Sequence, residues 1–287
     1  MPGERRIGVG DGVSLHVREW EQRPGANRGT DGQRWLCVHG LASNGRTWDG
    51  VARRLHELGH HVATVDLRGH GRSDNPEDGY DFPTLCADLV AVLDGLGWDD
   101  AVVAGQSTGG NLAVDLAVRQ PGRVRAVAGI DGGAIDLQRR WPVWDDCLAA
   151  LAPPRLEGTP LPEMEALLRR RHPDWSDDGV AATLANFETR PDGTLRPWLA
   201  RDHHLRLLRA LWEHRPAHFL PEVAVPVLLV VAGGGGEHDD TAAKAADVKD
   251  AAAALGTLAV HWIAPADHDV HVQQPRTVAD LLHAALR

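Results

Sequence analysis

Two patterns of hydrophobic residues follow one another along this chain. Near the start, residues 5–10 and 13–21 alternate apolar with polar side chains around the turn Gly10-Asp11-Gly12, which predicts a β-hairpin. Farther on, nearly continuous apolar runs are separated by helical or loop segments. The runs cover residues 34–40, 61–67, 101–107, 124–131, 225–233 and 258–266. Such runs are typical of parallel strands buried on both faces, so we predict a doubly wound α/β fold with a mostly parallel sheet.

The alternation of apolar runs and helices stops between residues 133 and 222. This stretch has no convincing strand, but it has helical periodicity, for example at Leu205, Leu208 and Trp212. We therefore predict a core of residues 1–132 and 223–287 and a helical cap of residues 133–222, lying over the sheet edge where open α/β folds carry their sites. Five of the ten tryptophans fall in the predicted cap: Trp141, Trp144, Trp175, Trp198 and Trp212.

Composition and charge narrow the class of protein. The 287 residues are 43% hydrophobic and 24% charged, as in an ordinary folded domain, and the net charge of −10 argues against a nucleic-acid partner. The N-terminus lacks an apolar leader and no apolar run is long enough to span a bilayer, so we expect a cytoplasmic protein without a membrane partner. Cys37, Cys86 and Cys147 are widely spaced and odd in number, which favours reduced core thiols.

The segment "AGQSTGGN", residues 104–111, carries the first candidate for chemistry. Small residues stand two positions before and two after Ser107, as a strand that turns sharply into a helix requires. By itself, the segment fits a glycine-rich surface turn equally well. A serine hydroxyl attacks a carbonyl efficiently only when a nearby base takes its proton.

Four segments in order resemble the α/β-hydrolase superfamily: "VHGLASNGRTW", "DLRGHGRSD", "GQSTGG" and "PADHDVHVQQP". The resemblance covers nearly the whole chain. It implies that Ser107 is the nucleophile, that His268 is the base, and that the backbone N–H groups of Leu41 and Thr108 form the oxyanion hole. His39 and His70 are then expected to shape loops, and His271 to lie in or at the rim of the pocket.

The carboxylate that orients His268 has more than one candidate. Asp131 stands twenty-four residues after Ser107, at one acid position of the superfamily. The other position, after the run 225–233, holds glycines followed by "GEHDD", in which Asp239 and Asp240 lie at suitable separations from His268. We favour Asp131, because the glycine run would leave the later carboxylates poorly positioned. Consecutive acidic residues in such a loop rarely provide metal geometry, so we expect no metal.

These expectations combine into a cofactor-independent serine hydrolase that cleaves an ester or lactone of a small molecule through an acyl-enzyme. The chain contains no P-loop or dinucleotide fingerprint, so no nucleotide cofactor is implied. A tryptophan-rich cap favours a bulky apolar or aromatic substrate, with Trp144 and Trp212 as candidate contacts, although packing of the cap explains most tryptophans. Hydrolysis of a carbon–carbon bond or thioester, acyl transfer, and a non-catalytic binding protein are the alternatives. The sequence determines neither the substrate nor the oligomeric state.

Overall fold

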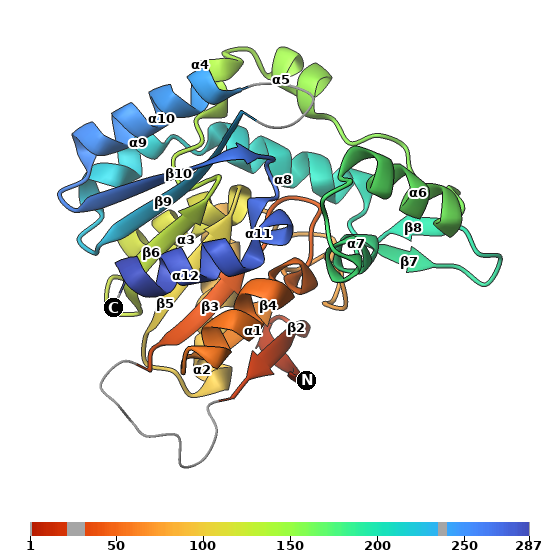
Figure 1. Cartoon of the computed structure of the whole chain (residues 1–287), viewed down its shortest axis with the longest axis horizontal. Coiled ribbons are helices and arrows are strands. Elements are labelled where there is room, and N and C mark those ends of the chain that lie inside the picture. Colours follow the sequence, from red (N-terminus) through yellow and green to blue (C-terminus); the bar gives the residue numbers. More distant parts are fainter. Residues whose placement is uncertain (1, 22–31, 235–239, 287) are drawn as a thin grey trace.

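The computed structural model describes residues 2–21, 32–234 and 240–286, and within them eight strands form one sheet (Figure 1). The order across the sheet is β1-β2-β4-β3-β5-β6-β9-β10. Neighbours from β4 to β10 are parallel, while β1 pairs with β2, and β2 with β4, in antiparallel fashion. The bounds are β1 Gly3–Gly10, β2 Val13–Trp20, β3 Arg34–Val38, β4 His61–Val65, β5 Ala101–Gln106, β6 Val124–Ile130, β9 Val227–Gly234 and β10 Leu258–Ala266. The predicted N-terminal hairpin and the mostly parallel sheet are both confirmed.

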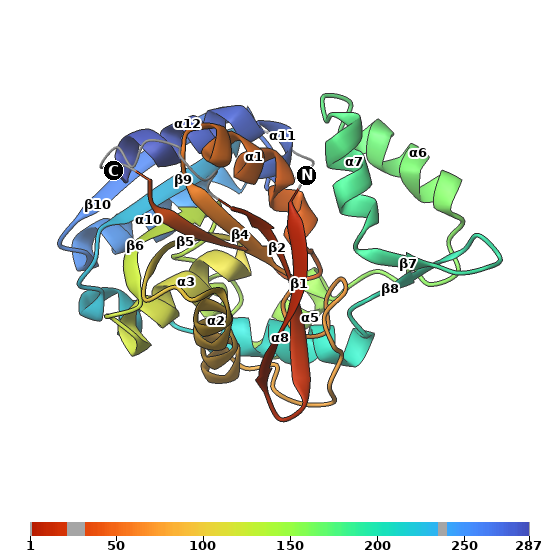
Figure 2. The same ribbon diagram turned by 90° about the horizontal axis from the view of Figure 1, so that it is seen from below.

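Helices cover both faces of the sheet (Figure 2). On one face lie α1 (Asp49–Glu57), α11 (Val270–Gln273) and α12 (Pro275–Ala285); on the other lie α2 (Phe82–Leu96) and α3 (Thr108–Arg119). Successive side chains of a strand point to opposite faces, and Trp35 and Leu36 of β3 accordingly belong to different core clusters. This double coverage explains why the central strands appear in the sequence as continuous apolar runs.

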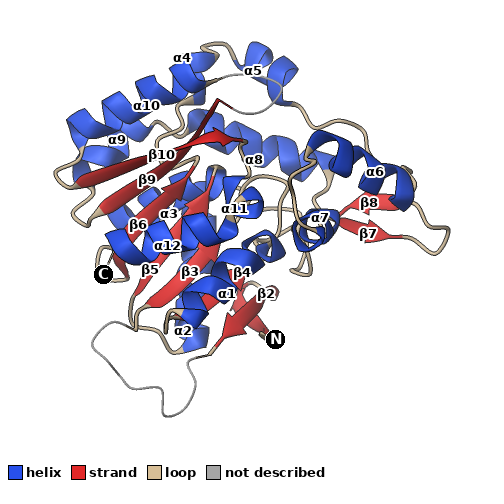
Figure 3. Cartoon of the chain, viewed as in Figure 1, coloured by secondary structure: helices blue, strands red, loops and turns tan. Residues whose placement is uncertain are grey.

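The segment between β6 and β9 is mainly helical but also contains a small hairpin (Figure 3). The strands β7 (Phe187–Thr189) and β8 (Leu195–Pro197) pair in antiparallel fashion, so the expectation that this stretch contains no strand is wrong. Three residues per strand are too few to show an alternating pattern. Its helical elements are α4 Leu137–Arg140, α5 Trp144–Leu151, α6 Leu161–Arg171, α7 Asp177–Leu184, α8 Arg201–Glu213, α9 Pro216–Phe219 and the 3₁₀ turn η2 Leu220–Glu222.

Part of this segment projects beyond the sheet as a lobe, formed by α6, α7, β7 and β8 (Figure 2). The lobe touches the core near the end of β3, where the Asn44 side chain donates a hydrogen bond to the carbonyl oxygen of Ala182 at 2.9 Å. The placement of a cap at residues 133–222 stays a proposal.

Two sequence-based expectations concern the chain as a whole. All three cysteines are buried and unpaired, which confirms that they are core thiols. Within residues 2–21, 32–234 and 240–286, none of the helices combines the length and apolar character that a bilayer span requires.

Candidate active site

Ser107 occupies the sharp turn between β5 and α3. Its backbone has φ 52° and ψ −121°, in a region that non-glycine residues rarely adopt. A Cβ at Gly105 would collide with the carbonyl oxygen of Gly109, and a Cβ at Gly109 would lie 2.5 Å from the carbonyl oxygen of His39. Glycine is therefore required two positions before and two after Ser107, as a strained elbow demands.

The side chains of Asp131 and His268 contact each other next to the strand that precedes Ser107. Asp131 directly follows β6, the strand beside β5, and His268 lies in the loop between β10 and α11. His268 Nδ1 is 2.6 Å from Asp131 Oδ2, and Asp131 Oδ1 accepts a 3.0 Å hydrogen bond from the backbone N–H of Ala232. An Nδ1–H that donates to the carboxylate leaves Nε2 of His268 as the acceptor that a base needs.

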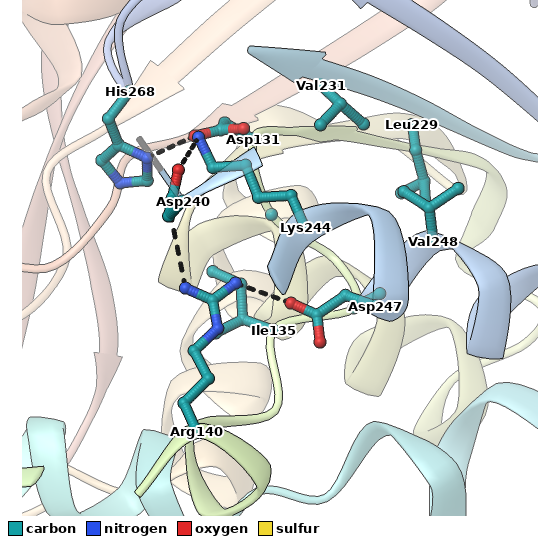
Figure 4. Close-up of a pocket in the computed structure, with 12 residues that line it drawn as sticks. Asp131, Ile135, Arg140, Leu229, Val231, Asp240, Lys244, Asp247, Val248 and His268 are labelled. Atoms are coloured by element: carbon teal, nitrogen blue, oxygen red, sulfur yellow. Dashed lines mark hydrogen bonds and ion pairs between the residues drawn. The ribbon is translucent and has the colours of Figure 1, made fainter. Parts of the chain in front are cut away.

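Of the other carboxylates considered for this position, Asp240 makes no hydrogen bond or ion pair with His268 within the described residues. Asp240 precedes α10 (Thr241–Ala254) and pairs with Lys244 and Arg140 (Figure 4). Asp239 lies outside the described residues, as does Glu237. Of the candidate acids, the structure thus brings Asp131 to the histidine.

Burial and the neighbouring charges shift the pKa values of Asp131 and His268 in opposite directions. Burial raises the pKa of Asp131, but its hydrogen bond to His268 and the charges of His268 and Lys244 outweigh burial and lower the pKa below its ordinary value. About half of the His268 side chain is exposed, with a relative accessibility of 52%. Its partial burial lowers the pKa of the imidazole, whereas the hydrogen bond and charge of Asp131 raise it, with a net rise. Asp131, with 1% of its side chain exposed, therefore stays ionised and stabilises an imidazolium on His268.

Ser107 and His268 both lie within the described residues, and no hydrogen bond joins the hydroxyl of Ser107 to the ring of His268. Their segments are tied together nonetheless, because Gln106 Nε2 donates to the carbonyl oxygen of His268 at 3.2 Å and Ser107 N donates to Ile130 O at 3.0 Å. Catalytic hydrogen bonds are often long or poorly aligned before substrate binds. The roles of nucleophile and base stay predictions.

Leu41 and Thr108 present backbone N–H groups next to the elbow. The loop that holds Leu41 packs closely on it, since a Cβ at the preceding Gly40 would lie 3.1 Å from the Cβ of Ser107. Thr108 is the first residue of α3, where helical N–H groups have no partner in the helix. Within the described residues neither N–H makes a hydrogen bond, so both are available to a developing oxyanion.

Several histidines near the site are buried and uncharged. His39 uses both ring nitrogens, Nδ1 towards Gly40 O at 2.7 Å and Nε2 as acceptor from Leu67 N at 3.0 Å, which agrees with a loop-shaping residue. Burial lowers the pKa of His70 to about 3 and that of His271 to about 3. His271 is fully buried against Trp48, so of its two expected places, in the pocket or at its rim, the rim is wrong.

Two further histidines, His204 and His214, are buried farther from Ser107 along the chain. Burial lowers the pKa of each to about 4. The ring of His214 stacks between those of Phe82 and Phe219, at centroid distances of 4.3 and 4.6 Å. Such sites hold an imidazole in its neutral form.

A cavity of about 1380 Å³, here called the large cavity, opens between the core and the segment 133–222. Ala42 and Ser43, which follow Leu41, form part of its lining, whereas Ser107 does not. Basic groups outnumber acidic ones along it. Its ionisable lining residues are His70, Arg155, Glu157, Arg171, His172, Arg196, Arg201 and His204.

Trp144 and Trp212 lie apart from the lining of the large cavity. Their rings contact each other at 5.8 Å between centroids, Arg209 lies over both, and Trp212 Nε1 donates to Trp141 O at 2.8 Å. These contacts favour packing over substrate contact for the two tryptophans.

Comparison with known proteins identifies the family of this chain. The profile of the alpha/beta hydrolase fold matches residues 36–274. The chain belongs to this family. It is similar to the 2-(acetamidomethylene)succinate hydrolase of Mesorhizobium japonicum, with 30% identity over 231 residues, which are 79% of this chain and 76% of the relative. It also resembles a non-heme chloroperoxidase of Streptomyces lividans, with 34% identity over 119 residues, 41% of each chain.

Solved structures show the same fold. The E-2-(acetamidomethylene)succinate hydrolase superposes with a TM-score of 0.79 at 24% identity, covering 99% of this chain and 98% of the other. The enol-lactonase of Burkholderia xenovorans gives a TM-score of 0.67 at 20% identity, with 96% and 97% covered. The family resemblance inferred from the four motifs is thus confirmed, and the protein is an α/β-hydrolase that acts on a small molecule.

Lys244 is the residue at this site that reasoning from the sequence missed. It lies in an alanine-rich helix after the glycine run, and no motif includes it. The available signal was its spacing, four residues after the candidate acid Asp240 on a helix, which places the two side chains together.

Proposed function

We propose that the protein is a serine hydrolase that cleaves an acyl bond through a covalent acyl-enzyme and needs no cofactor. The observation that carries this proposal is the buried Asp131 carboxylate bonded to His268 Nδ1 beside the strained turn of Ser107. Nucleophile, base, orienting acid and oxyanion donors would then all come from the chain itself.

The reaction would proceed in two halves. His268 Nε2 takes the proton of Ser107 as Oγ attacks the acyl carbon, and the N–H groups of Leu41 and Thr108 stabilise the oxyanion. The imidazolium, held by Asp131, gives its proton to the leaving group. Water activated by His268 then attacks the acyl-enzyme and releases Ser107.

The bond and substrate are proposed from the large cavity. Its volume suits a bulky substrate, and apolar residues such as Phe187, Trp198 and Leu199 share the lining with four arginines. Arginine recognises carboxylate groups in a bidentate manner. We favour an ester or lactone that bears a carboxylate on its bulky part.

A second candidate is an amide-type bond in an acidic substrate. The basic lining of the large cavity fits the acid named in the relative from Mesorhizobium japonicum, a hydrolase of 2-(acetamidomethylene)succinate. The same Ser-His-Asp arrangement serves acyl transfer from nitrogen as well as from oxygen. Carbon–carbon and thioester cleavage remain alternatives on the same residues.

The test begins with a fluorophosphonate probe, which should label the native protein but not Ser107→Ala. A non-catalytic binding protein would show no labelling in either. Matched aryl esters, lactones and amides, each neutral or bearing a carboxylate, would then rank the bonds. Arg155→Gln should raise KM for the carboxylate member of a pair by about tenfold to a hundredfold, as loss of a charged hydrogen bond worth roughly 1.5–3 kcal/mol implies, and should leave the neutral member unchanged.

A further inference from the structure

The amine of Lys244 lies beside the carboxylate of Asp131, the proposed triad acid (Figure 4). Its Nζ lies 2.7 Å from Asp131 Oδ2 and 2.9 Å from Asp240 Oδ1, and it donates a 3.1 Å hydrogen bond to the carbonyl oxygen of Ala232. Three acceptors thus surround the three N–H bonds of one ammonium group. Only 14% of the side chain is exposed.

The ammonium and the imidazole share one oxygen of the carboxylate. Asp131 Oδ2 is 2.6 Å from His268 Nδ1 and 2.7 Å from Lys244 Nζ, while Oδ1 accepts the N–H of Ala232. The carboxylate cannot rotate without breaking one of these contacts. Its negative charge is divided between a group that is always charged and one that must gain and lose a proton.

Lysine is rare in this chain. Of its thirty lysine and arginine residues only Lys244 and Lys249 are lysines. A planar guanidinium directs its N–H bonds within one plane, whereas an ammonium directs them to three separate sides. The three acceptors around Nζ come from the residue that precedes α10, from β9 and from the turn after β6, which suits the ammonium.

We propose that Lys244 is a positioning residue of the active site, whose ammonium holds Asp131 against His268 and shares its charge, so that the imidazole remains an unprotonated base at lower pH than Asp131 alone would allow. This proposal rests on the proposed role of His268 as the base. Lys244 touches neither Ser107 nor the acyl carbon in this scheme.

The sign of the effect follows from the charges. Burial lowers the pKa of His268, Asp131 raises it, and the charge of Lys244 lowers it. Removing the ammonium takes away a lowering influence and leaves the raising one, so the pKa of His268 rises. A larger share of the enzyme then carries an imidazolium, which cannot accept the proton of Ser107.

Other ionisable groups around His268 leave this sign unchanged. Asp269 follows it directly, and burial raises the pKa of that carboxyl. Asp267 is engaged elsewhere, 2.9 Å from His172 Nδ1 and bonded to Trp175. His271 of α11 and His39 of the loop after β3 are buried, and burial lowers the pKa of each.

The remaining charges lie behind Lys244. Arg140 of α4 is 3.5 Å from Asp240 Oδ2 and 2.7 Å from Asp247 Oδ2. Arg140 therefore fixes the carboxylate of Asp240 on the far side of the ammonium. Removing the charge of Asp240 would leave more of the Lys244 charge acting on Asp131 and His268.

The experiment compares Lys244→Met with Lys249→Met, which removes the same charge from an exposed position on the same helix. The pKa of His268 is measured by NMR in the free protein, with its signal assigned from its loss in His268→Gln. In Lys244→Met we expect a rise of about one unit, with the acid limb of kcat/KM moving to higher pH by the same amount. Lys249→Met should match the wild type.

Two more variants distinguish the effect of the Lys244 charge from the effect of its side-chain shape. Lys244→Arg keeps the charge but not the direction of the three N–H bonds, so it should raise the pKa of His268 by less than Lys244→Met does. Asp240→Asn should lower that pKa by less than Lys244→Met raises it. A folded Lys244→Met with an unchanged pKa overturns the proposal, as does an equal shift in Lys244→Arg. If Lys244→Met does not fold, Lys244→Gln, which removes the charge but keeps a polar side chain, takes its place, and an unchanged pKa of His268 in that variant overturns the proposal. The NMR titration needs no substrate, so failure of the proposed hydrolysis would be seen separately, as a loss of probe labelling.

Discussion

Close backbone contacts set the geometry around Ser107, whereas the large cavity includes exposed arginine side chains in its lining. At the elbow, close backbone contacts leave space only for glycine at positions 105 and 109, and a buried carboxylate fixes the histidine. In the large cavity, the arginines that line it are exposed to solvent. The packing at the elbow therefore leaves little room for substitution, whereas exposed arginines in the large cavity can be replaced without disturbing a close contact. Mutations in the two regions should therefore fail in different ways.

The largest effect is expected at the elbow itself. Ser107→Ala or His268→Ala should lower kcat by about 10⁶-fold, because members of a triad act as a unit. Circular dichroism and the melting temperature should remain those of the wild type. A variant that keeps a tenth of the wild-type kcat would show that the nucleophile or base lies elsewhere.

The acid gives the next largest effect. Asp131→Asn should lower kcat by about 10⁴-fold, because an amide neither fixes the histidine tautomer nor stabilises the imidazolium. Asp240→Asn, which lies on the other side of Lys244, should change kcat by less than tenfold. Steady-state kinetics on the same aryl ester measure both, and a reversed ranking would move the acid to the loop before α10.

A third test concerns the tight packing of the elbow. Gly109→Val places a side chain 2.5 Å from the carbonyl oxygens of Val38 and His39, and should cost at least about 1–3 kcal/mol of stability, as overpacking does. Gly122→Val is the matched control, because a Cβ there meets no atom within 4 Å. Urea unfolding of both variants measures the difference, and equal stability would contradict a sterically fixed turn.

The smallest effect is expected from Trp212→Ala, which should leave the preference for large or small substrates unchanged. The ring packs on Trp144 and Arg209 and lies outside the lining of the large cavity. The melting temperature should fall, and kcat/KM for large and small esters should fall by the same factor. A change of more than about threefold in the ratio of the two, or roughly 0.7 kcal/mol, would show that Trp212 contacts the substrate.

The same contrast explains what could be predicted from the sequence. The sheet and elbow were predictable because apolar runs and glycine spacing record local steric needs. Asp131 could be favoured over Asp240 because it ends a strand adjacent to β5. The hairpin β7–β8 was missed because its two strands are three residues each, and Lys244 was missed because its partner Asp131 is more than a hundred residues away.

The buried histidines limit the acidity that this fold tolerates. An unfolded chain binds protons on histidine below about pH 6.5, whereas His70, His271, His204 and His214 take them up in the native state only near pH 3 to 4. Their contribution to stability is therefore complete above pH 6.5 and decreases as the pH falls. Each contributes a slope of about 1.4 kcal/mol per pH unit between its two pKa values. Urea titrations from pH 7 to pH 5 should show that unfolding takes up protons, so acid weakens this fold already at a pH where ordinary carboxylates still carry their charge.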